Sequence, residues 1–380
     1  MQVLVLGGGL VGSAIARNLS RDASLAITVA DFSQEVCEAL KEQYGLHSIK
    51  LDVSDEQALT KAVKKVDLVV GAVPGSLGYA MLETVIRAEK DIVDISFFPE
   101  DPLTLHQLAL DHGVTAVVDA GLAPGLSNLV LGRYQREYDP LDHFACYVGG
   151  LPKLRKWPFE YQSVFSPADV IEEYIRPVRM KIGGHLVTRE ALSDRELIDL
   201  PRIGTLEASN TDGLRTLLST VQVPNMLEKT LRYPGHSERM RLLRDTGFFS
   251  PESLDIKGHP VAPLDVTSRL LFQAWQPEED GHDLAVMRVI LSGLLDGRHI
   301  TTTIDLFDEY DPVTETTAMA RTTGYTCAAV VRLVMSGGYH DPGIRPLEYL
   351  GADKEVYRQL LKDLTEWGIT LNIIQSVEED

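Results

Sequence analysis

A chain of 380 residues with 44% apolar residues is long enough for two domains, each with a core of its own. The net charge of −19 argues against partners such as nucleic acid or anionic membranes, and no apolar run approaches the length of a membrane span. The apolar N-terminus lacks a basic leader, and the three cysteines form no C-x-x-C pair, so we expect a cytoplasmic protein without a signal peptide, disulfide or metal site.

The first predicted strand runs directly into Gly7-x-Gly9-x-x-Gly12, and a helix follows. In a dinucleotide-binding turn, Gly7 permits the tight bend, Gly9 lets the backbone approach a pyrophosphate, and Gly12 allows helix and strand to pack closely. Leu10 and Val11 lie at the N-terminal end of the predicted helix, where free N–H groups favour phosphate. The alternative is a glycine-rich turn without a ligand.

The second predicted strand ends at Asp31, about 20 residues after the last glycine of the motif. A carboxylate at this position accepts hydrogen bonds from the adenosine ribose and repels a 2′-phosphate. The residues that follow, Phe32 and Ser33, bring no arginine, so the sequence favours NAD over NADP.

Strands and helices alternate as far as residue 118, which is typical of an α/β Rossmann fold with a doubly wound parallel sheet. Strands are predicted at 2–6, 26–30, 48–51, 67–72, 91–94 and 114–118, with helices at 12–20, 33–44, 55–65, 76–88 and 101–112. Because ligands bind at the carboxyl edge of such sheets, Asp52 and Val53 are expected near the adenine, and Ala72, Val73 and Pro74 beside the cofactor.

Two carboxylates close the fifth and sixth predicted strands, Asp94 and Asp119. Both would face the crevice expected for the nicotinamide, which makes them candidates for proton transfer, although an aspartate at a strand end is also a common turn former. The segment after Asp119 contains Gly121 and Pro124, which would bring backbone amides to the cofactor or form the hinge to the second domain.

Past residue 140, strands rich in β-branched residues indicate a mixed α+β substrate domain with two polar clusters. The candidate substrate ligands are Asn210, Asp212, Gly213, Arg215, Arg232 and Tyr233. Arginines bind carboxylates in bidentate fashion and an aspartate binds an ammonium, while His236 suits proton transfer near neutral pH. The alternatives are ordinary surface ion pairs and a structural histidine.

The sequence ends with predicted helices at 318–335 and 354–367 and a strand at 370–374. We expect these elements to pack back on the first domain. The predicted division is therefore a discontinuous NAD-binding domain of residues 1–124 and 316–380, with a substrate and dimerisation domain of residues 125–315 between them.

Several multi-residue segments together resemble the saccharopine dehydrogenase-like family over nearly the whole chain. They are the glycine motif, Asp119 to Asn128, Tyr147-Val-Gly-Gly-Leu-Pro152, Asn210-x-Asp212-Gly213-Leu-Arg215, Thr230-Leu-Arg-Tyr-Pro-Gly-His236 and Ala318-Met-Ala-Arg-Thr-Thr-Gly324. The resemblance implies a Rossmann domain, a mixed α/β substrate domain, and C-terminal elements that rejoin the first domain.

Within that family, glutamate-forming saccharopine dehydrogenases carry an aspartate before the Pro-Gly pair, where this chain has Ala123, and a lysine near the end of the fifth strand, where Glu89 or Lys90 stands. The pattern is most similar to L-lysine 6-dehydrogenases. The resemblance therefore implies a dehydrogenase that oxidises the C–N bond in the side chain of L-lysine, and Asp31 favours NAD as its cofactor. Because large two-domain dehydrogenases commonly dimerise, we expect a homodimer. The alternatives are a glutamate-forming saccharopine dehydrogenase, a carboxynorspermidine-type polyamine dehydrogenase and a non-enzymatic NAD sensor.

Overall fold

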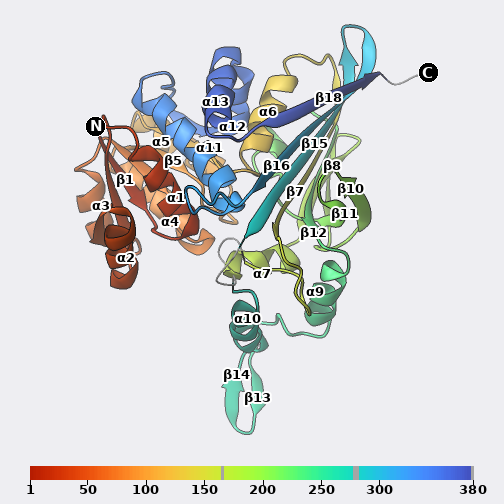
Figure 1. Ribbon diagram of the computed structural model, residues 1–380, viewed down its shortest axis with the longest axis horizontal. Helices are drawn as coiled ribbons and strands as arrows, with labels where there is room; N and C mark the ends of the chain where they lie inside the picture. Colours follow the sequence, from red (N-terminus) through yellow and green to blue (C-terminus); the bar gives the residue numbers. More distant parts are fainter. Residues whose placement is uncertain (164–166, 277–281, 378–380) are drawn as a thin grey trace. The chain divides into compact units, whose positions relative to one another are not determined.

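The computed structural model describes residues 1–163, 167–276 and 282–377, and the protein forms two compact units (Figure 1). Unit 1 contains residues 1–139, 215–221 and 320–370, and unit 2 contains residues 140–214, 222–319 and 371–380. The fold class is as predicted, a parallel Rossmann-type sheet in one unit and a mixed sheet in the other.

Unit 1 is built on a parallel sheet in the order β17-β6-β5-β4-β1-β2-β3. Its strands are β1 (Gln2–Leu6), β2 (Ala26–Asp31), β3 (His47–Lys50), β4 (Leu68–Gly71), β5 (Asp91–Asp94), β6 (Thr115–Val118) and β17 (Gly343–Pro346). Its helices are α1 (Leu10–Leu19), α2 (Gln34–Tyr44), α3 (Glu56–Val63), α4 (Gly75–Arg87), η1 (Pro102–Leu105), α5 (His106–Asp111), α6 (Leu126–Tyr134), α8 (Leu217–Thr220), α11 (Ala318–Met335), α12 (Leu347–Ala352) and α13 (Lys354–Glu366).

Apolar runs explain the central strands of unit 1, since β4 and β6 are buried along their whole length. Strands covered on both faces need continuous apolar sequence, whereas half-exposed strands alternate. The strand order reverses beside β1, so right-handed crossovers place α1 on one face and α4 on the other. Capping side chains fix several helix starts, such as the Asp55 carboxylate on α3 and Ser33 on α2.

Unit 2 is built on a mixed sheet in the order β10-β11-β12-β7-β15-β16-β18, and β8 and β9 extend it beside β12. Its strands are β7 (Leu141–Pro152), β8 (Val178–Ile182), β9 (His185–Arg189), β10 (Glu196–Leu200), β11 (Gly204–Asn210), β12 (Asn225–Arg232), β15 (Asp283–Leu295), β16 (Arg298–Glu309) and β18 (Leu371–Val377). Its helices are α7 (Pro167–Ile175), α9 (His236–Asp245) and α10 (Pro263–Ala274), and β13 (Leu254–Ile256) pairs with β14 (His259–Val261) in a separate hairpin.

The division into units differs from the predicted one at both ends of the second domain. Helix α6 belongs to unit 1 because it packs closely on α12, with the Cα of Gly132 lying against the backbone of Glu348. The last strand, expected on the first domain, instead pairs antiparallel with β16 in unit 2. The helices α12 and α13 and the strand β17 do rejoin unit 1, and β17 extends its sheet beside β6.

No helix among the described residues is both long and apolar enough to cross a membrane.

Candidate cofactor and substrate sites

The glycine motif joins β1 to α1 in unit 1 and has the geometry expected for a dinucleotide-binding turn. Gly7 adopts a φ of 102°, which side chains disfavour, and a Cβ on Gly12 would lie 2.0 Å from the Gly7 carbonyl oxygen. A Cβ on Gly9 would meet nothing within 4 Å, so open space borders the turn there. Leu10 and Val11 form the first turn of α1, which no side chain caps. Their N–H groups can therefore receive a phosphate.

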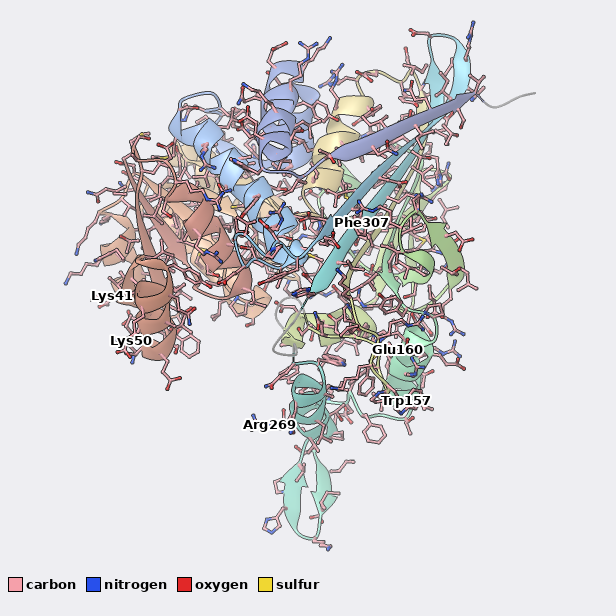
Figure 2. All side chains as sticks on the ribbon, viewed as in Figure 1. Lys41, Lys50, Trp157, Glu160, Arg269 and Phe307 are labelled. Carbon is pink, nitrogen blue, oxygen red and sulfur yellow. The ribbon has the colours of Figure 1, made fainter. Side chains whose placement is uncertain are left out.

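Asp31 is linked to this turn by a hydrogen bond. Its Oδ2 accepts from the backbone N–H of Gly8 at 2.8 Å, and its Oδ1 accepts from Ser33 N–H at 2.9 Å. Both bonds fix the direction of the carboxylate. Phe32 beside it is 74% exposed. The cation nearest in the sheet register is Lys50, which pairs with Asp31 across β2 and β3 and lies near α2 with Lys41 (Figure 2).

The other predicted cofactor residues follow β3 and β4. Asp52 turns back on its own loop, where its Oδ1 accepts hydrogen bonds from the N–H and hydroxyl of Ser54. Val53 packs against the apolar core of unit 1. After β4, Ala72 continues the sheet by donating to Leu6, Val73 is buried, and Pro74 precedes α4. Both loops leave the carboxyl edge of the sheet, where the glycine turn also lies.

The segment after β6 makes a compact turn in unit 1. Gly121 bridges to Gly125, and the peptide bond between Ala123 and Pro124 is cis. The side chain of Asn128 accepts from the Gly125 N–H and donates to the buried carboxylate of Glu348 at 3.1 Å. The polar contacts of Asn128 and Glu348 connect α6 with α12. This part of the predicted segment therefore holds two helices of unit 1 together.

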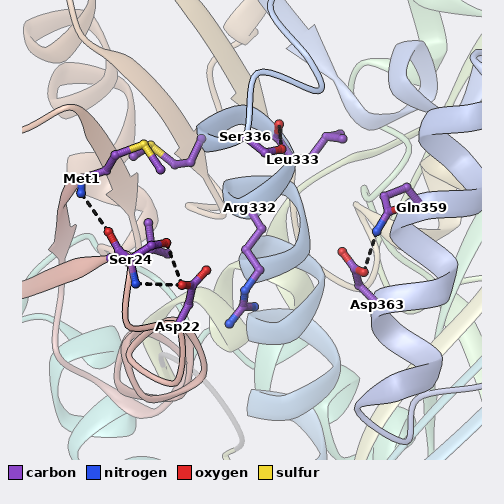
Figure 3. A pocket seen from close by; sticks show the side chains of 10 residues that line it. Met1, Asp22, Ser24, Arg332, Leu333, Ser336, Gln359 and Asp363 are labelled. Atoms are coloured by element: carbon purple, nitrogen blue, oxygen red, sulfur yellow. Dashed lines mark hydrogen bonds between the residues drawn. The ribbon is translucent and has the colours of Figure 1, made fainter.

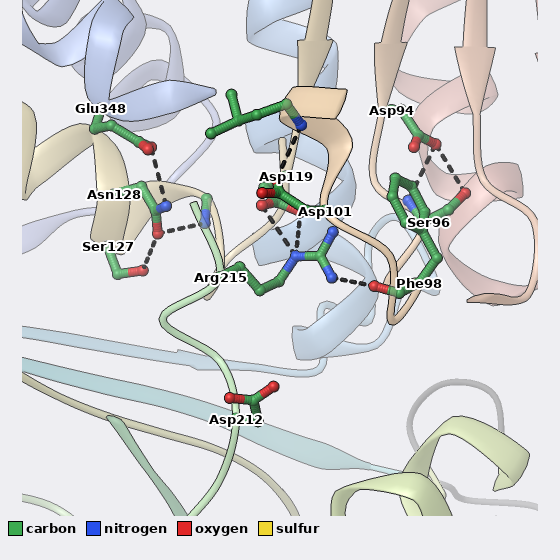
Figure 4. Close-up of polar contacts among 12 residues, drawn as sticks. Asp94, Ser96, Phe98, Asp101, Asp119, Ser127, Asn128, Asp212, Arg215 and Glu348 are labelled. Carbon is green, nitrogen blue, oxygen red and sulfur yellow. Dashed lines mark hydrogen bonds and ion pairs between the residues drawn. The ribbon is translucent and has the colours of Figure 1, made fainter. Parts of the chain in front are cut away.

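Asp94 ends β5 and Asp119 directly follows the neighbouring strand β6, and Arg215 pairs with Asp119 (Figure 4). Arg215 Nε donates to both oxygens of Asp119, at 2.8 and 3.1 Å, and Nη1 donates to the Phe98 carbonyl. Asp94 Oδ1 accepts from the N–H and hydroxyl of Ser96. Burial raises the pKa of Asp94 to about 7, opposed by the Ser96 hydrogen bonds.

Arg215 was expected in the substrate domain, but it belongs to unit 1. It opens the segment of residues 215–221, which joins this unit from the middle of the sequence, and Thr220 donates to Glu348 at the far end of that segment. The ion pair between Arg215 and Asp119 was not predicted, because the two residues are 96 positions apart and no local pattern in the sequence connects them.

The remaining residues of the first polar cluster lie in unit 2 and already have partners. Asp212 accepts a bidentate ion pair from Arg179, with a shortest distance of 2.8 Å, and Asn210 donates to Ser193 and Asp194. Gly213 lies against the Glu228 carboxylate, which a Cβ would approach to 1.8 Å. An ammonium group would therefore have to share Asp212 with Arg179.

His236 is completely buried in unit 2, and both ring nitrogens are engaged. Nδ1 contacts the Phe159 carbonyl at 2.9 Å, which can only accept, so Nε2 is the acceptor for the Tyr174 hydroxyl at 2.9 Å. Burial, reinforced by the charge of Arg232, lowers the pKa of His236 to about 3. The ring is therefore neutral and has no free lone pair, which does not favour the predicted role in proton transfer.

Arg232 lies in the same buried cluster. It pairs with Glu173 at 3.2 Å and stacks over the Tyr161 ring, and burial raises the pKa of Glu173. Within the described residues, Arg232 Nε, Tyr161 Oη and Trp275 Nε1 have no hydrogen-bond partner. All three atoms are donors, which is the chemistry a carboxylate requires. Tyr233, also predicted as a ligand, donates instead to the Pro152 carbonyl.

Sequence reasoning missed Glu173, Tyr174 and Trp275 as neighbours of the predicted arginine and histidine. The Tyr174 ring lies 5.8 Å from that of His236 and 6.4 Å from that of Trp275, although these residues come from segments up to about a hundred residues apart. No local motif marks such contacts.

A surface pocket of about 300 Å³ opens in unit 1 beside Met1, Asp22, Arg332 and Asp363 (Figure 3). It lies beside α13 and before the first residue of β1, and none of the predicted site residues lines it.

Comparison with known families gives two matches that together cover most of the sequence. The model of the saccharopine dehydrogenase NADP binding domain matches residues 3–117, and that of the saccharopine dehydrogenase C-terminal domain matches residues 121–369.

Curated relatives include glutamate-forming, NADP-dependent saccharopine dehydrogenases. The Saccharomyces cerevisiae protein is 25% identical over 73% of this chain, and the Pyricularia oryzae protein is 27% identical over 73%. The chain spans 65% and 64% of their lengths. The solved structure of the apo yeast enzyme matches with a TM-score of 0.79 at 21% identity, covering 99% of both proteins, and so shares the fold.

Proposed function

Because the chain belongs to the saccharopine dehydrogenase family, we propose that it is a nicotinamide-dependent dehydrogenase that oxidises the secondary amine of saccharopine and forms L-glutamate. The observation that carries this proposal is the agreement of both family models with relatives named for that reaction. The carboxyl edge of the unit 1 sheet supports it, since an uncapped glycine turn and buried carboxylates occur there together.

L-Lysine 6-dehydrogenase is the second candidate, and Ala123 favours it. Glutamate-forming members of the family carry an aspartate at this position, and the resemblance to lysine dehydrogenases rests on its absence. Both candidates share one type of step, the removal of hydride from a carbon that bears nitrogen.

In the proposed reaction, hydride leaves the carbon attached to nitrogen while the amine loses its proton. Water then adds to the resulting substrate imine, and the C–N bond breaks to give an amine and an aldehyde. The nicotinamide cofactor, when bound, supplies the hydride acceptor. The protein would have to hold the substrate carboxylates, accept one proton and exclude water until hydride has moved.

For the proton acceptor, we propose the carboxylates Asp94 and Asp119 ahead of His236. His236 has a lowered pKa and no free nitrogen lone pair. Asp119 lies at the same sheet edge, where Arg215 Nε holds its two oxygens in place. For the substrate carboxylates we propose Arg232, whose Nε is free among the described residues, although a carboxylate must compete with Glu173 for its charge.

We propose NAD as the preferred cofactor, because the Asp31 carboxylate is held beside the glycine turn, where the ribose 2′-OH would bind. The relatives are named as NADP-dependent, so this preference would distinguish the protein from them. Lys50 is the nearest cation in register that could otherwise receive a 2′-phosphate.

We further propose a cytoplasmic homodimer. The net charge of −19 supports the absence of nucleic-acid and anionic membrane partners. Sedimentation equilibrium at micromolar concentration is expected to give twice the mass of one 42.0 kDa subunit.

The decisive experiment follows NADH or NADPH formation at 340 nm with saccharopine and with L-lysine, side by side, at mildly alkaline pH. Turnover of saccharopine with release of glutamate supports the main proposal. Turnover of lysine with release of ammonia would replace it by the second candidate. Cofactor binding without turnover of either amine would contradict both, and would direct attention to polyamine substrates or a sensor.

A further inference from the structure

Two buried polar atoms of unit 1, one a hydrogen-bond acceptor and one a donor, have no partner among the described residues, and Figure 4 shows their side chains in one region. They are Asp94 Oδ2, an acceptor, and Arg215 Nη2, a donor. Both side chains are at least nine-tenths buried. Because nearly all buried polar groups in proteins are paired, two orphans at one sheet edge require an explanation.

The backbone fixes how these atoms are placed. The Ala120 N–H donates to the Asp94 carbonyl at 3.0 Å, which holds the end of β6 against the end of β5. Asp119, one residue earlier, fixes the Arg215 guanidinium through two contacts to Nε. Figure 4 shows the two carboxylates at these adjoining strand ends with Arg215 reaching Asp119. One strand spacing therefore separates Asp94 from Asp119, the carboxylate that holds the Arg215 guanidinium.

The same place borders the cofactor loop predicted after β4. A Cβ on Gly71, the last residue of β4, would lie 2.1 Å from Asp94 Oδ1, so the strand end passes directly over the carboxylate. The Gly71 carbonyl accepts from Ile95 N–H, one residue beyond Asp94. The orphan pair is thus continuous with the edge of the sheet where the nicotinamide end of a dinucleotide binds.

A proton-transfer role for Asp94 would use its free oxygen but would leave Arg215 Nη2 unexplained. A carboxylate ligand would satisfy Arg215 but would place two negative charges together at Asp94. A primary amide satisfies both atoms, since its N–H donates to Asp94 Oδ2 and its carbonyl accepts from Arg215 Nη2.

We propose that Asp94 and Arg215 bind the carboxamide of the nicotinamide ring and so select its orientation in the site. This proposal rests on the proposed nicotinamide cofactor. Of the two carboxylates proposed above as proton acceptors, it assigns Asp94 to the cofactor and leaves proton transfer to Asp119. It assigns Asp94 and Arg215 a role in cofactor recognition that the sequence did not suggest.

The test compares the affinity of the intact protein for NAD⁺, for its 3-acetylpyridine analogue and for ADP-ribose by titration calorimetry, with no substrate present. The analogue keeps the carbonyl but lacks the amide N–H, and ADP-ribose lacks the ring. Wild type is expected to bind NAD⁺ about tenfold more tightly than the analogue, the effect of one hydrogen bond to a charged acceptor.

Asp94→Asn keeps an oxygen for Ser96 but presents an N–H₂ in place of the free oxygen. NAD⁺ affinity is expected to fall about tenfold, while binding of the analogue and of ADP-ribose stays unchanged. Arg215→Lys is expected to weaken NAD⁺ and the analogue equally, because both have the carbonyl. The matched control is Asp101→Asn, a carboxylate that only caps the nearby 3₁₀ helix.

Equal affinity of wild type for NAD⁺ and the analogue, or an unchanged ratio in Asp94→Asn, would overturn the proposal. Loss of ADP-ribose binding as well would show that the nucleotide site itself is misplaced. If wild type binds NAD⁺ more tightly than the analogue but turns over neither saccharopine nor lysine, the carboxamide site stands and the proposed reaction is rejected. Failure of the carboxamide proposal and failure of the proposed function are therefore distinguishable.

Discussion

Burial has opposite consequences for two titratable side chains, His236 and Asp94. In each case it favours the neutral form, lowering the pKa of the imidazole to about 3 and raising that of the carboxyl to about 7. The histidine is thereby removed from chemistry near neutral pH, while the carboxyl is brought into that range. Residue type suggested the histidine from the sequence, whereas only the fold shows which group titrates there.

The raised pKa of Asp94 predicts how stability depends on pH. A carboxyl that binds its proton more tightly in the folded state stabilises the fold below its unfolded pKa near 4, and that contribution is lost as pH rises through about 7. Asp94→Asn is therefore expected to be more stable than wild type at pH 8, by up to ~4 kcal/mol, with little difference at pH 4. Urea denaturation at both values measures this, and Asp296→Asn in an exposed turn is the control.

Asp31 gives a prediction about cofactor choice. Asp31→Ala removes the acceptor for the ribose hydroxyls and the repulsion of a 2′-phosphate, so the preference for NAD over NADP should fall by about tenfold or more. Binding constants for both cofactors measure the change. If wild type already prefers NADP, the role proposed for Asp31 is wrong, and Lys50→Ala would then test the nearest cation.

Arg232 gives a prediction about substrate binding. Arg232→Met keeps much of the buried apolar stem but removes the charge, so the KM for the amino-acid substrate should rise about tenfold or more while the affinity for NAD stays unchanged. Arg241→Met, an exposed arginine of α9 paired with Asp245, is the matched control. A loss of NAD affinity with unchanged KM would place Arg232 outside the substrate site.

At the scale of elements, the sequence predicted what local periodicity determines. The strands from β1 to β6 and the helices between them were predicted within a few residues, because buried parallel strands and amphipathic helices have distinct patterns. The last strand, β18, was expected on the first domain but belongs to unit 2, because its exposed, uncharged residues pair with β16 through backbone groups that carry no sequence signal. The Arg215 pair and the aromatic neighbours of His236 were not foreseen because these side-chain contacts join segments far apart in the sequence.

The ion pair that attaches residues 215–221 to the end of β6 predicts a coupling between two elements. Arg215→Met alone leaves Asp119 buried and unpaired, which should cost about 3–5 kcal/mol in the free energy of unfolding. Arg215→Met with Asp119→Asn removes both charges and should restore a large part of that loss. Urea denaturation of the four proteins measures the coupling, and additive effects would show that the pair contributes no stability.

At the scale of the whole molecule, both sheets depend on the last third of the sequence for an edge strand. A protein that stops at Thr370 lacks β18 and leaves the edge of β16 open, so soluble yield should fall and aggregation should rise. A protein that stops at Val377 keeps the strand and is the control. Equal light scattering from the two truncated proteins would show that β18 is dispensable.

The late position of β17 and β18 also bears on how the protein emerges from the ribosome. More than two hundred residues are synthesised between β6 and its neighbour β17, and about sixty between β16 and β18. Through that interval each nascent sheet has an open edge capable of pairing with another molecule. Synthesis speed and chaperone supply should therefore limit the recovery of active protein, even where the finished protein is stable.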